Sequence, residues 1–176
     1  MPEWRSVKSS DDRVAHAHSR ALDYLGQPDV GRLLVAAKKS RHGIRDHLLT
    51  LMNFRHGIRI SEAVALRRQD VGLAQSRSWI ARLEDGLSGE QPVAGDKLRA
   101  IRRWTAQRED ALPSLFVSER KQLPTRQAVN YIIGAASTRA GLGRVRPHML
   151  RHSCGFALAN KGRDLHQRNA RKLVMP

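Results

Sequence analysis

The stretch Arg146–Gly162, RPHMLRHSCGFALANKG, carries the pattern that decides the fold. Apolar side chains recur every four residues, at Leu150, Cys154 and Leu158, which places them on one face of an α-helix. Pro147 suits the first turn of a helix, and a glycine commonly follows the last turn. We therefore predict a helix that begins after Pro147 and ends at Gly162.

Two histidines and an arginine crowd the first turns of this predicted helix. His148 and Arg151 are three residues apart, so they point the same way and could both hold one anionic group such as a phosphodiester. Alternatively, His148 caps the helix and Arg151 pairs with a surface carboxylate. His148 and His152 also have the spacing of two metal ligands, but HMLRH lacks the Glu of H-E-x-x-H and the sequence offers no obvious third ligand.

Working outward, the pattern predicts a mainly α fold with a small antiparallel β-sheet. Residues 1–25 are polar and are expected to form a tail or loose helix. The expected elements are a helix from Pro28, a second over 44–54 that Gly57 ends, a short third capped by Ser61, a β-hairpin over 79–93, a helix around 98–105, a strand at 115–117 and a helix capped by Thr125 that stops near Gly141.

Charge and composition narrow the class of partner. The 176 residues contain 32 Lys and Arg against 16 Asp and Glu, a formal charge of +16 that favours a nucleic-acid partner. The single cysteine excludes an internal disulfide and any zinc site built from several cysteines. No apolar run reaches the ~18 residues that span a bilayer, and the N-terminus lacks an apolar signal-peptide core. These features predict a soluble, cytoplasmic protein without a membrane partner.

A second candidate motif is Gly57-Ile-Arg-Ile-Ser-Glu62, in the tight connection between two predicted helices. A rigid turn there would fix the direction of Arg59. Taken alone, the same residues are equally an ordinary turn glycine, an exposed arginine and a capping serine.

The two motifs together resemble the catalytic domain of the tyrosine site-specific recombinases, the phage integrase family. The resemblance rests on GIRISEAVAL followed by Asp70-Val71, and on HMLRH, which begins about ninety residues after Arg59. It covers residues 25 to 164 and is greatest for the small fimbrial phase-variation recombinases. It implies catalytic roles for Arg59, His148 and Arg151 in holding the scissile phosphate, while a tyrosine attacks it without any metal or other cofactor.

The chain departs from the family pattern at two places. The family's hairpin lysine should fall just before Gly86, where Asp85 stands. After Gly162, the run Leu165–Asn169 echoes the family's L-G-H-R-N but has Gln167 where its histidine belongs. The only tyrosines, Tyr24 and Tyr131, precede His148; Tyr131 is expected to be partly buried. The expected organisation is a polar tail over 1–25, a C-terminally truncated catalytic domain over 26–164 and a divergent basic tail over 165–176.

Two functions remain open on this sequence. The resemblance implies a DNA-binding recombinase for site-specific inversion or integration, with the transcriptional regulation that fimbrial phase variation brings. It would act on double-stranded DNA, not on a small-molecule substrate, and is expected to be incomplete alone because Tyr24 and Tyr131 do not match the nucleophile. It would then assemble with itself or with an intact recombinase. The alternative is a non-catalytic regulator or inhibitor that occupies recombinase sites.

Overall fold

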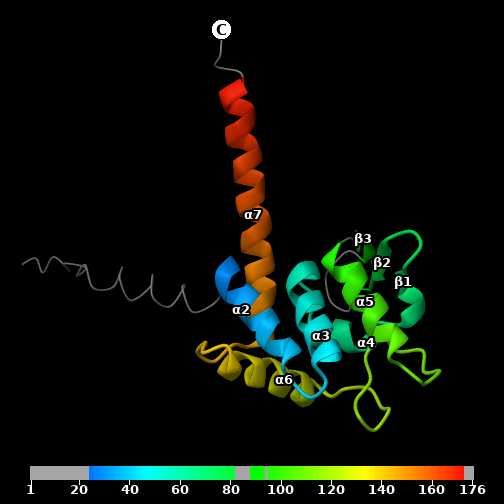
Figure 1. Cartoon of the computed structure of the whole chain (residues 1–176). Helices are drawn as coiled ribbons and strands as arrows, with labels where there is room; N and C mark the ends of the chain where they lie inside the picture. Colours follow the sequence, from blue (N-terminus) through cyan, green and yellow to red (C-terminus); the bar gives the residue numbers. More distant parts are fainter. Residues whose placement is uncertain (1–23, 82–87, 94, 173–176) are drawn as a thin grey trace, which may run out of the picture.

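The structure is a computed structural model that describes residues 24–81, 88–93 and 95–172, of which residues 163–172 are described only as helical backbone. Six helices, one 3₁₀ turn and three short strands follow one another in this part of the chain (Figure 1). In order they are α2 Gln27–Lys38, α3 Gly43–His56, α4 Ile60–Ala65, η1 Arg68–Asp70, β1 Val71–Gly72, β2 Arg77–Ile80, β3 Gly89–Pro92, α5 Asp96–Ala106, α6 Arg126–Arg139 and α7 Pro147–Lys172. The prediction of a mainly helical chain with a small antiparallel sheet is confirmed.

Helix α3 forms the centre of the body. It contacts α2, α5 and α7, and it is buried on nearly every side (Figure 1). Two of its buried polar side chains donate to its own backbone: Thr50 donates to the carbonyl of Asp46 at 2.8 Å and Asn53 donates to that of Leu49 at 3.0 Å. An apolar stripe on each neighbouring helix packs against α3, which explains why the four-residue repeats of the sequence predicted these helices correctly.

The sheet has the order β1-β2-β3 with antiparallel pairing throughout. Trp79 pairs with Glu90 and Ile80 with Gly89, which confirms the predicted hairpin. The strand β1 was not predicted, because a two-residue strand has no measurable alternation. The connection between β2 and β3, which carries Asp85, lies outside the described residues.

Three predicted elements differ from the structure. The segment 115–117 is not a strand: Leu115, Phe116 and Val117 are buried in a loop, and the preceding residue, Ser114, forms an isolated antiparallel bridge with Arg67. Burial alone made this run apolar, so its composition resembled that of a strand.

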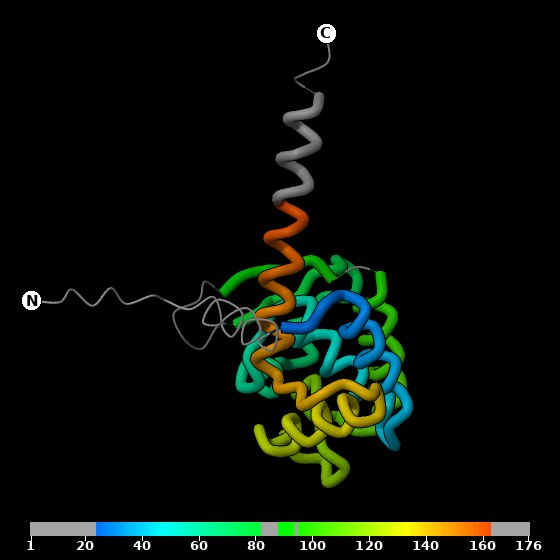
Figure 2. The backbone as a smooth tube through the Cα atoms, turned by 90° about the vertical axis from the view of Figure 1, so that its left-hand side faces the viewer, coloured from blue at the N-terminus to red at the C-terminus, as the bar shows by residue number. Residues whose placement is uncertain are grey.

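Helix α4 begins one residue before Ser61, so the predicted serine cap is wrong. The first turn is capped instead by Glu62, whose Oε2 accepts the backbone N–H of Arg59 at 2.8 Å. Helix α7 does not end at Gly162 but runs to Lys172, and it extends away from the other elements (Figure 1). Figure 2 shows that the coloured part of this helix, which ends at Gly162, already leaves the body. A glycine in a solvated helix costs only about 1 kcal/mol, too little to end it by itself.

Two side chains are more exposed than the sequence indicated. Leu158, which continues the apolar register of α7, is 63% exposed because the helix has left the body at that point. Tyr131, expected to be partly buried, is 77% exposed on α6. Both lie on helices whose inward faces are filled by other residues.

Candidate phosphate-binding cleft

The first wall of the candidate site is the turn between α3 and α4. Gly57 ends α3 with φ +56°, a left-handed conformation that glycine adopts without steric cost. Its missing side chain also matters, because a Cβ there would lie 3.4 Å from the Sγ of Cys154 on α7. The turn therefore packs closely against α7, and Arg59 follows it immediately.

Arg59 contacts the buried carboxylate of Glu62. Its backbone N–H donates to Glu62, and its Nη1 lies 3.7 Å from Oε1 of the same residue. The Glu62 side chain is 1% exposed, whereas that of Arg59 is 37% exposed. The carboxylate therefore orients the guanidinium from the protein side and leaves its other face toward solvent.

The second wall is the first turn of α7. His148 is exposed, and its ring meets that of His152 edge to face with centroids 6.1 Å apart. Arg151 is half-buried and donates from Nη1 to the carbonyl of Gly57 at 3.0 Å. This contact joins the two sequence motifs, although 94 positions separate the bonded residues. Among the residues whose side chains the structure describes, Arg151 forms no ion pair with a carboxylate, contrary to the alternative interpretation.

The buried side of α7 fixes these side chains in place. Leu150 is fully buried, and Ser153 donates to the carbonyl of Met149 at 2.7 Å while accepting the N–H of Leu25 at 2.7 Å. Cys154 packs over the α3–α4 turn. The apolar register predicted from the sequence thus anchors α7 and turns His148 and Arg151 to the opposite side.

A cleft of about 460 Å³ lies between the first turns of α4, α6 and α7. All three predicted site residues line it, and so do three polar residues for which no role was predicted: Arg126, Asn130 and Arg146. Arg126 and Asn130 come from α6, whose Thr125 cap accepts the N–H of Ala128 at 3.1 Å as predicted. The position of Arg126 directly after a capping threonine was the one available signal, since it places the side chain at a helix start.

The lining of this cleft is strongly cationic. Four arginines and one histidine face it, at Arg59, Arg126, Arg146, His148 and Arg151. No Asp or Glu is among the described residues that line it, because Glu62 lies beneath Arg59. Forked guanidinium donors from several directions suit an anion with several acceptor oxygens. Among the described residues, no group of three or more His, Cys, Asp or Glu is arranged to hold a metal ion.

Solved structures with the same fold are recombinases and integrases. The XerA recombinase superposes with a TM-score of 0.69 at 23% identity, over 79% of this chain and 51% of that one. The XerH recombinase bound to its difH substrate gives 0.68 at 22% identity, over 82% of this chain and 45% of that one. The chain therefore spans about half the length of these structures.

The sequence comparison identifies the family. Residues 23–169 match the phage integrase family, and the chain belongs to it. It is 38% identical to the type 1 fimbriae regulatory protein FimE of Escherichia coli K12 over 147 residues, which are 80% of this chain and 74% of that protein. FimB of the same strain is 36% identical, over 84% of this chain and 76% of that one. The resemblance to tyrosine recombinases and to the fimbrial recombinases in particular is confirmed.

Within the described residues, no helix is long and apolar enough to cross a membrane.

Proposed function

We propose that this chain binds double-stranded DNA in the cleft between α4, α6 and α7 and takes part in site-specific recombination by holding a phosphodiester there. The observation that carries the proposal is the lining of the cleft, where arginines from three helices converge with no described carboxylate among them. A phosphodiester presents two non-bridging oxygens that accept such donors. Family membership and the names of the relatives support the reaction class.

In this proposal Arg59 and Arg151 grip the phosphate from two elements. Charge gathers on the non-bridging oxygens when a nucleophile adds to phosphorus, so donors fixed in advance stabilise that state more than the starting diester. Glu62 orients Arg59, and the carbonyl of Gly57 orients Arg151. His148, on the same turn as Arg151, supplies a third donor.

The attacking group is the part that these residues do not supply. Tyr131 is exposed on α6 and lines a separate groove beside Glu119, and Tyr24 stacks on Phe156 with ring centroids 4.4 Å apart. Neither tyrosine lines the cleft. We therefore propose that the chain by itself holds the phosphate without cutting the strand, and that strand transfer uses a tyrosine from a partner recombinase.

The positions of the tyrosines also favour a second function. A chain that occupies recombinase sites without cutting them would act as a regulator or inhibitor. Asp85 stands at the hairpin position where the family resemblance implies a lysine, and it also favours the regulator. An ionised carboxylate, unlike the ammonium group of a lysine, has no proton to donate to the leaving oxygen.

A nicked duplex that carries inverted repeats tests both functions. We expect duplex binding that weakens steeply with salt and weakens further in Arg59→Ala. No covalent adduct should form with the chain alone, and an adduct should appear when a catalytically competent relative is added. Binding without an adduct in the mixture favours the regulator. A covalent adduct with the chain alone would contradict the claim of incompleteness.

The matched control is Arg102→Ala. Arg102 is exposed on α5 and does not line the cleft, so the variant loses the same charge elsewhere. If the double variant Arg59→Ala/Arg151→Ala binds the duplex as well as Arg102→Ala does, the cleft is not the binding site.

A further inference from the structure

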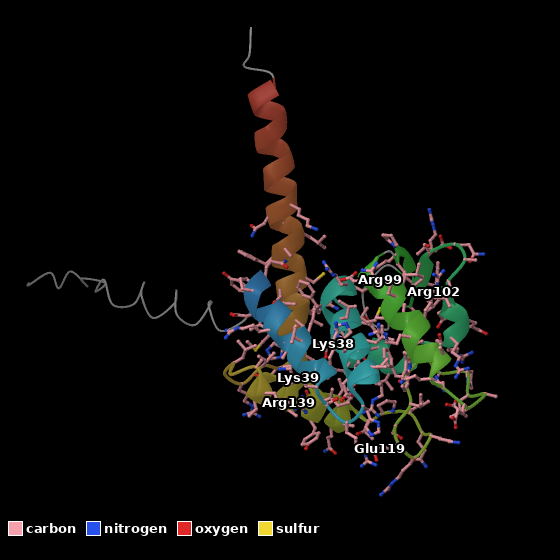
Figure 3. All side chains as sticks on the ribbon, viewed as in Figure 1. Lys38, Lys39, Arg99, Arg102, Glu119 and Arg139 are labelled. Carbon is pink, nitrogen blue, oxygen red and sulfur yellow. The ribbon has the colours of Figure 1, made fainter. Side chains whose placement is uncertain are left out.

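A second cationic cavity, of about 310 Å³, lies between α2, α3 and α5. It shares no lining residue with the cleft described above. The cavity adjoins the first turns of α3, whereas the cleft lies beyond the end of that helix. Since 14 helical residues span about 20 Å, the two sites are separated by roughly that distance. Figure 3 shows Lys38 and Arg99, from α2 and α5, at this part of the surface.

Three cations line the cavity: Lys38 from α2 and Arg99 and Arg103 from α5. The two arginines are four residues apart, so they lie on one face of α5. Within the part of the chain that the structure describes, none of the three forms an ion pair or a side-chain hydrogen bond. All three side chains are exposed, so water and salt screen their mutual repulsion, and an anion bound between them would reduce it further.

Among the described residues that line the cavity, Asp96 is the one acid, and it already forms an ion pair. Asp96 accepts from Nη2 of Arg55 at 2.9 Å and from the N–H of Lys97 at 2.9 Å. Burial opposes its ionisation, but these donors outweigh burial and keep the pKa of Asp96 below its ordinary value. Asp96 is therefore a carboxylate whose charge is shared with Arg55, and it faces three cations with a single negative charge.

His47 also lines the cavity, and one of its ring nitrogens already forms a hydrogen bond with the backbone. Its Nδ1 lies 3.1 Å from the carbonyl of Leu34, which can only accept, so Nδ1 carries a hydrogen and donates. Nε2 is then the nitrogen available to a ligand, and it donates to an anion only when the ring is protonated. Burial lowers the pKa of His47, and the charges of Lys38 and Arg103 lower it further, against the opposing effects of Leu34 and Asp96.

The backbone holds the two sides of the cavity in a fixed relation. A Cβ on Gly43 would lie 2.0 Å from the carbonyl oxygen of Lys38, so only glycine lets the start of α3 approach the end of α2 this closely. Lys38 is thereby held opposite α5 by the chain itself, independently of any ligand.

We infer that this cavity binds a phosphoryl group, which Lys38, Arg99 and Arg103 contact together with Nε2 of His47. A phosphate monoester carries roughly −1.5 to −2 charges at neutral pH and three acceptor oxygens, which matches three cations and an imidazole better than a carboxylate does. A terminal phosphate of a free phosphorylated molecule has these properties, whereas a phosphodiester of a DNA backbone carries one charge and two non-bridging oxygens and matches the cavity less well.

The test is an NMR titration of the His47 imidazole in the full chain at constant ionic strength, with inorganic pyrophosphate in one arm and a short DNA duplex in the other. A bound phosphoryl group stabilises the imidazolium, so the pKa of His47 should rise as the site fills and the change should saturate. Saturation with pyrophosphate supports a free phosphorylated ligand, whereas saturation with the duplex alone would overturn the match to a phosphate monoester. A response that never saturates, or that sodium chloride reproduces, would overturn the inference.

Variants make the test specific to the cavity. Arg103→Ala and Lys38→Ala should each weaken binding about tenfold, the scale of one charge-assisted hydrogen bond. Arg102→Ala, one position away on α5 and outside the cavity, should leave it unchanged. Arg59→Ala should also leave it unchanged, which separates this site from the cleft. Equal weakening in Arg102→Ala and Arg103→Ala would reduce the effect to net charge and refute the site.

Discussion

Arg151 donates from Nη1 to the carbonyl of Gly57 at 3.0 Å, and this hydrogen bond ties the first turn of α7 to the turn that carries Arg59. The guanidinium is planar and has further N–H donors, so one donor fixes its orientation while the others remain for a ligand. The left-handed glycine contributes twice: its carbonyl accepts from Arg151, and its missing Cβ admits Cys154. The two halves of the phosphate grip are thus set by one backbone turn.

Replacing Arg151 by alanine should weaken duplex binding and lower its salt dependence. Loss of one phosphate contact reduces the slope of log K against log salt by about one. The hydrogen bond to Gly57 is lost as well, at a cost of about 1 kcal/mol in the free energy of unfolding. Fluorescence anisotropy across a salt series and urea denaturation measure the two effects.

Arg151→Lys is the informative companion variant. Lysine keeps the charge but not the planar fork, so the salt slope should stay near that of the wild type while affinity at a given salt falls. If Arg151→Lys binds as tightly as the wild type, charge alone explains the role of Arg151 and the forked geometry is irrelevant.

Gly57→Ala should destabilise the fold by about 1 to 2 kcal/mol. An alanine at φ +56° is strained, and its Cβ would press on Cys154. Gly31→Ala on α2 is the control, because φ there is ordinary and a Cβ meets nothing within 4 Å. The control should be stabilised by up to about 1 kcal/mol. Denaturant midpoints that shift in the same direction for both variants would contradict the argument.

Asp110→Asn should reduce stability at neutral pH and lose this effect in acid. Arg108, whose side chain is 2% exposed, hydrogen-bonds Asp110, and this lowers the pKa of the carboxyl to about 2 from an ordinary 3.8. A depressed pKa means that the carboxylate stabilises the folded state fully above about pH 4, and that the contribution fades as the pH falls toward 2.

The unfolding free energies of wild type and Asp110→Asn should therefore differ by about 1 to 3 kcal/mol at pH 7 and converge only as the pH falls to about 2. Glu109→Gln, an exposed neighbour, should show no such pH-dependent gap. A constant difference from pH 7 to pH 2 would mean that the asparagine disturbs packing and not charge.

The sequence predicted well the parts of the fold that depend on one repeating face. Leu150 and Cys154 are buried as their spacing required, and Thr125 caps α6. The site was harder to predict. His148 and Arg151 also had an ordinary structural explanation until Arg59 was considered with them. Nothing in the local sequence reveals that the α3–α4 turn and the start of α7, so far apart in the chain, line one cleft.

The features that escaped prediction arise from tertiary contacts. Arg126 and Arg146 line the cleft because α6 and α7 both begin at its edge, a relation that no local pattern encodes. Leu115 is fully buried in a loop, where Trp104 and Arg108 donate to its carbonyl, so its apolar side chain reflects burial and not a strand. The exposure of Leu158 follows from where α7 leaves the body, which helical periodicity does not determine.

The cap of α6 offers a last prediction that connects local structure to the cleft. Thr125 accepts the N–H of Ala128, and the next residue, Arg126, lines the cleft. Thr125→Ala should cost about 1 kcal/mol of stability and weaken duplex binding, because a frayed first turn no longer holds Arg126 in place. Thr125→Ser keeps the acceptor oxygen and should restore both properties. Urea denaturation and anisotropy on the same preparations measure them; unchanged duplex affinity in Thr125→Ala, with the stability loss present, would show that Arg126 contributes nothing to DNA binding.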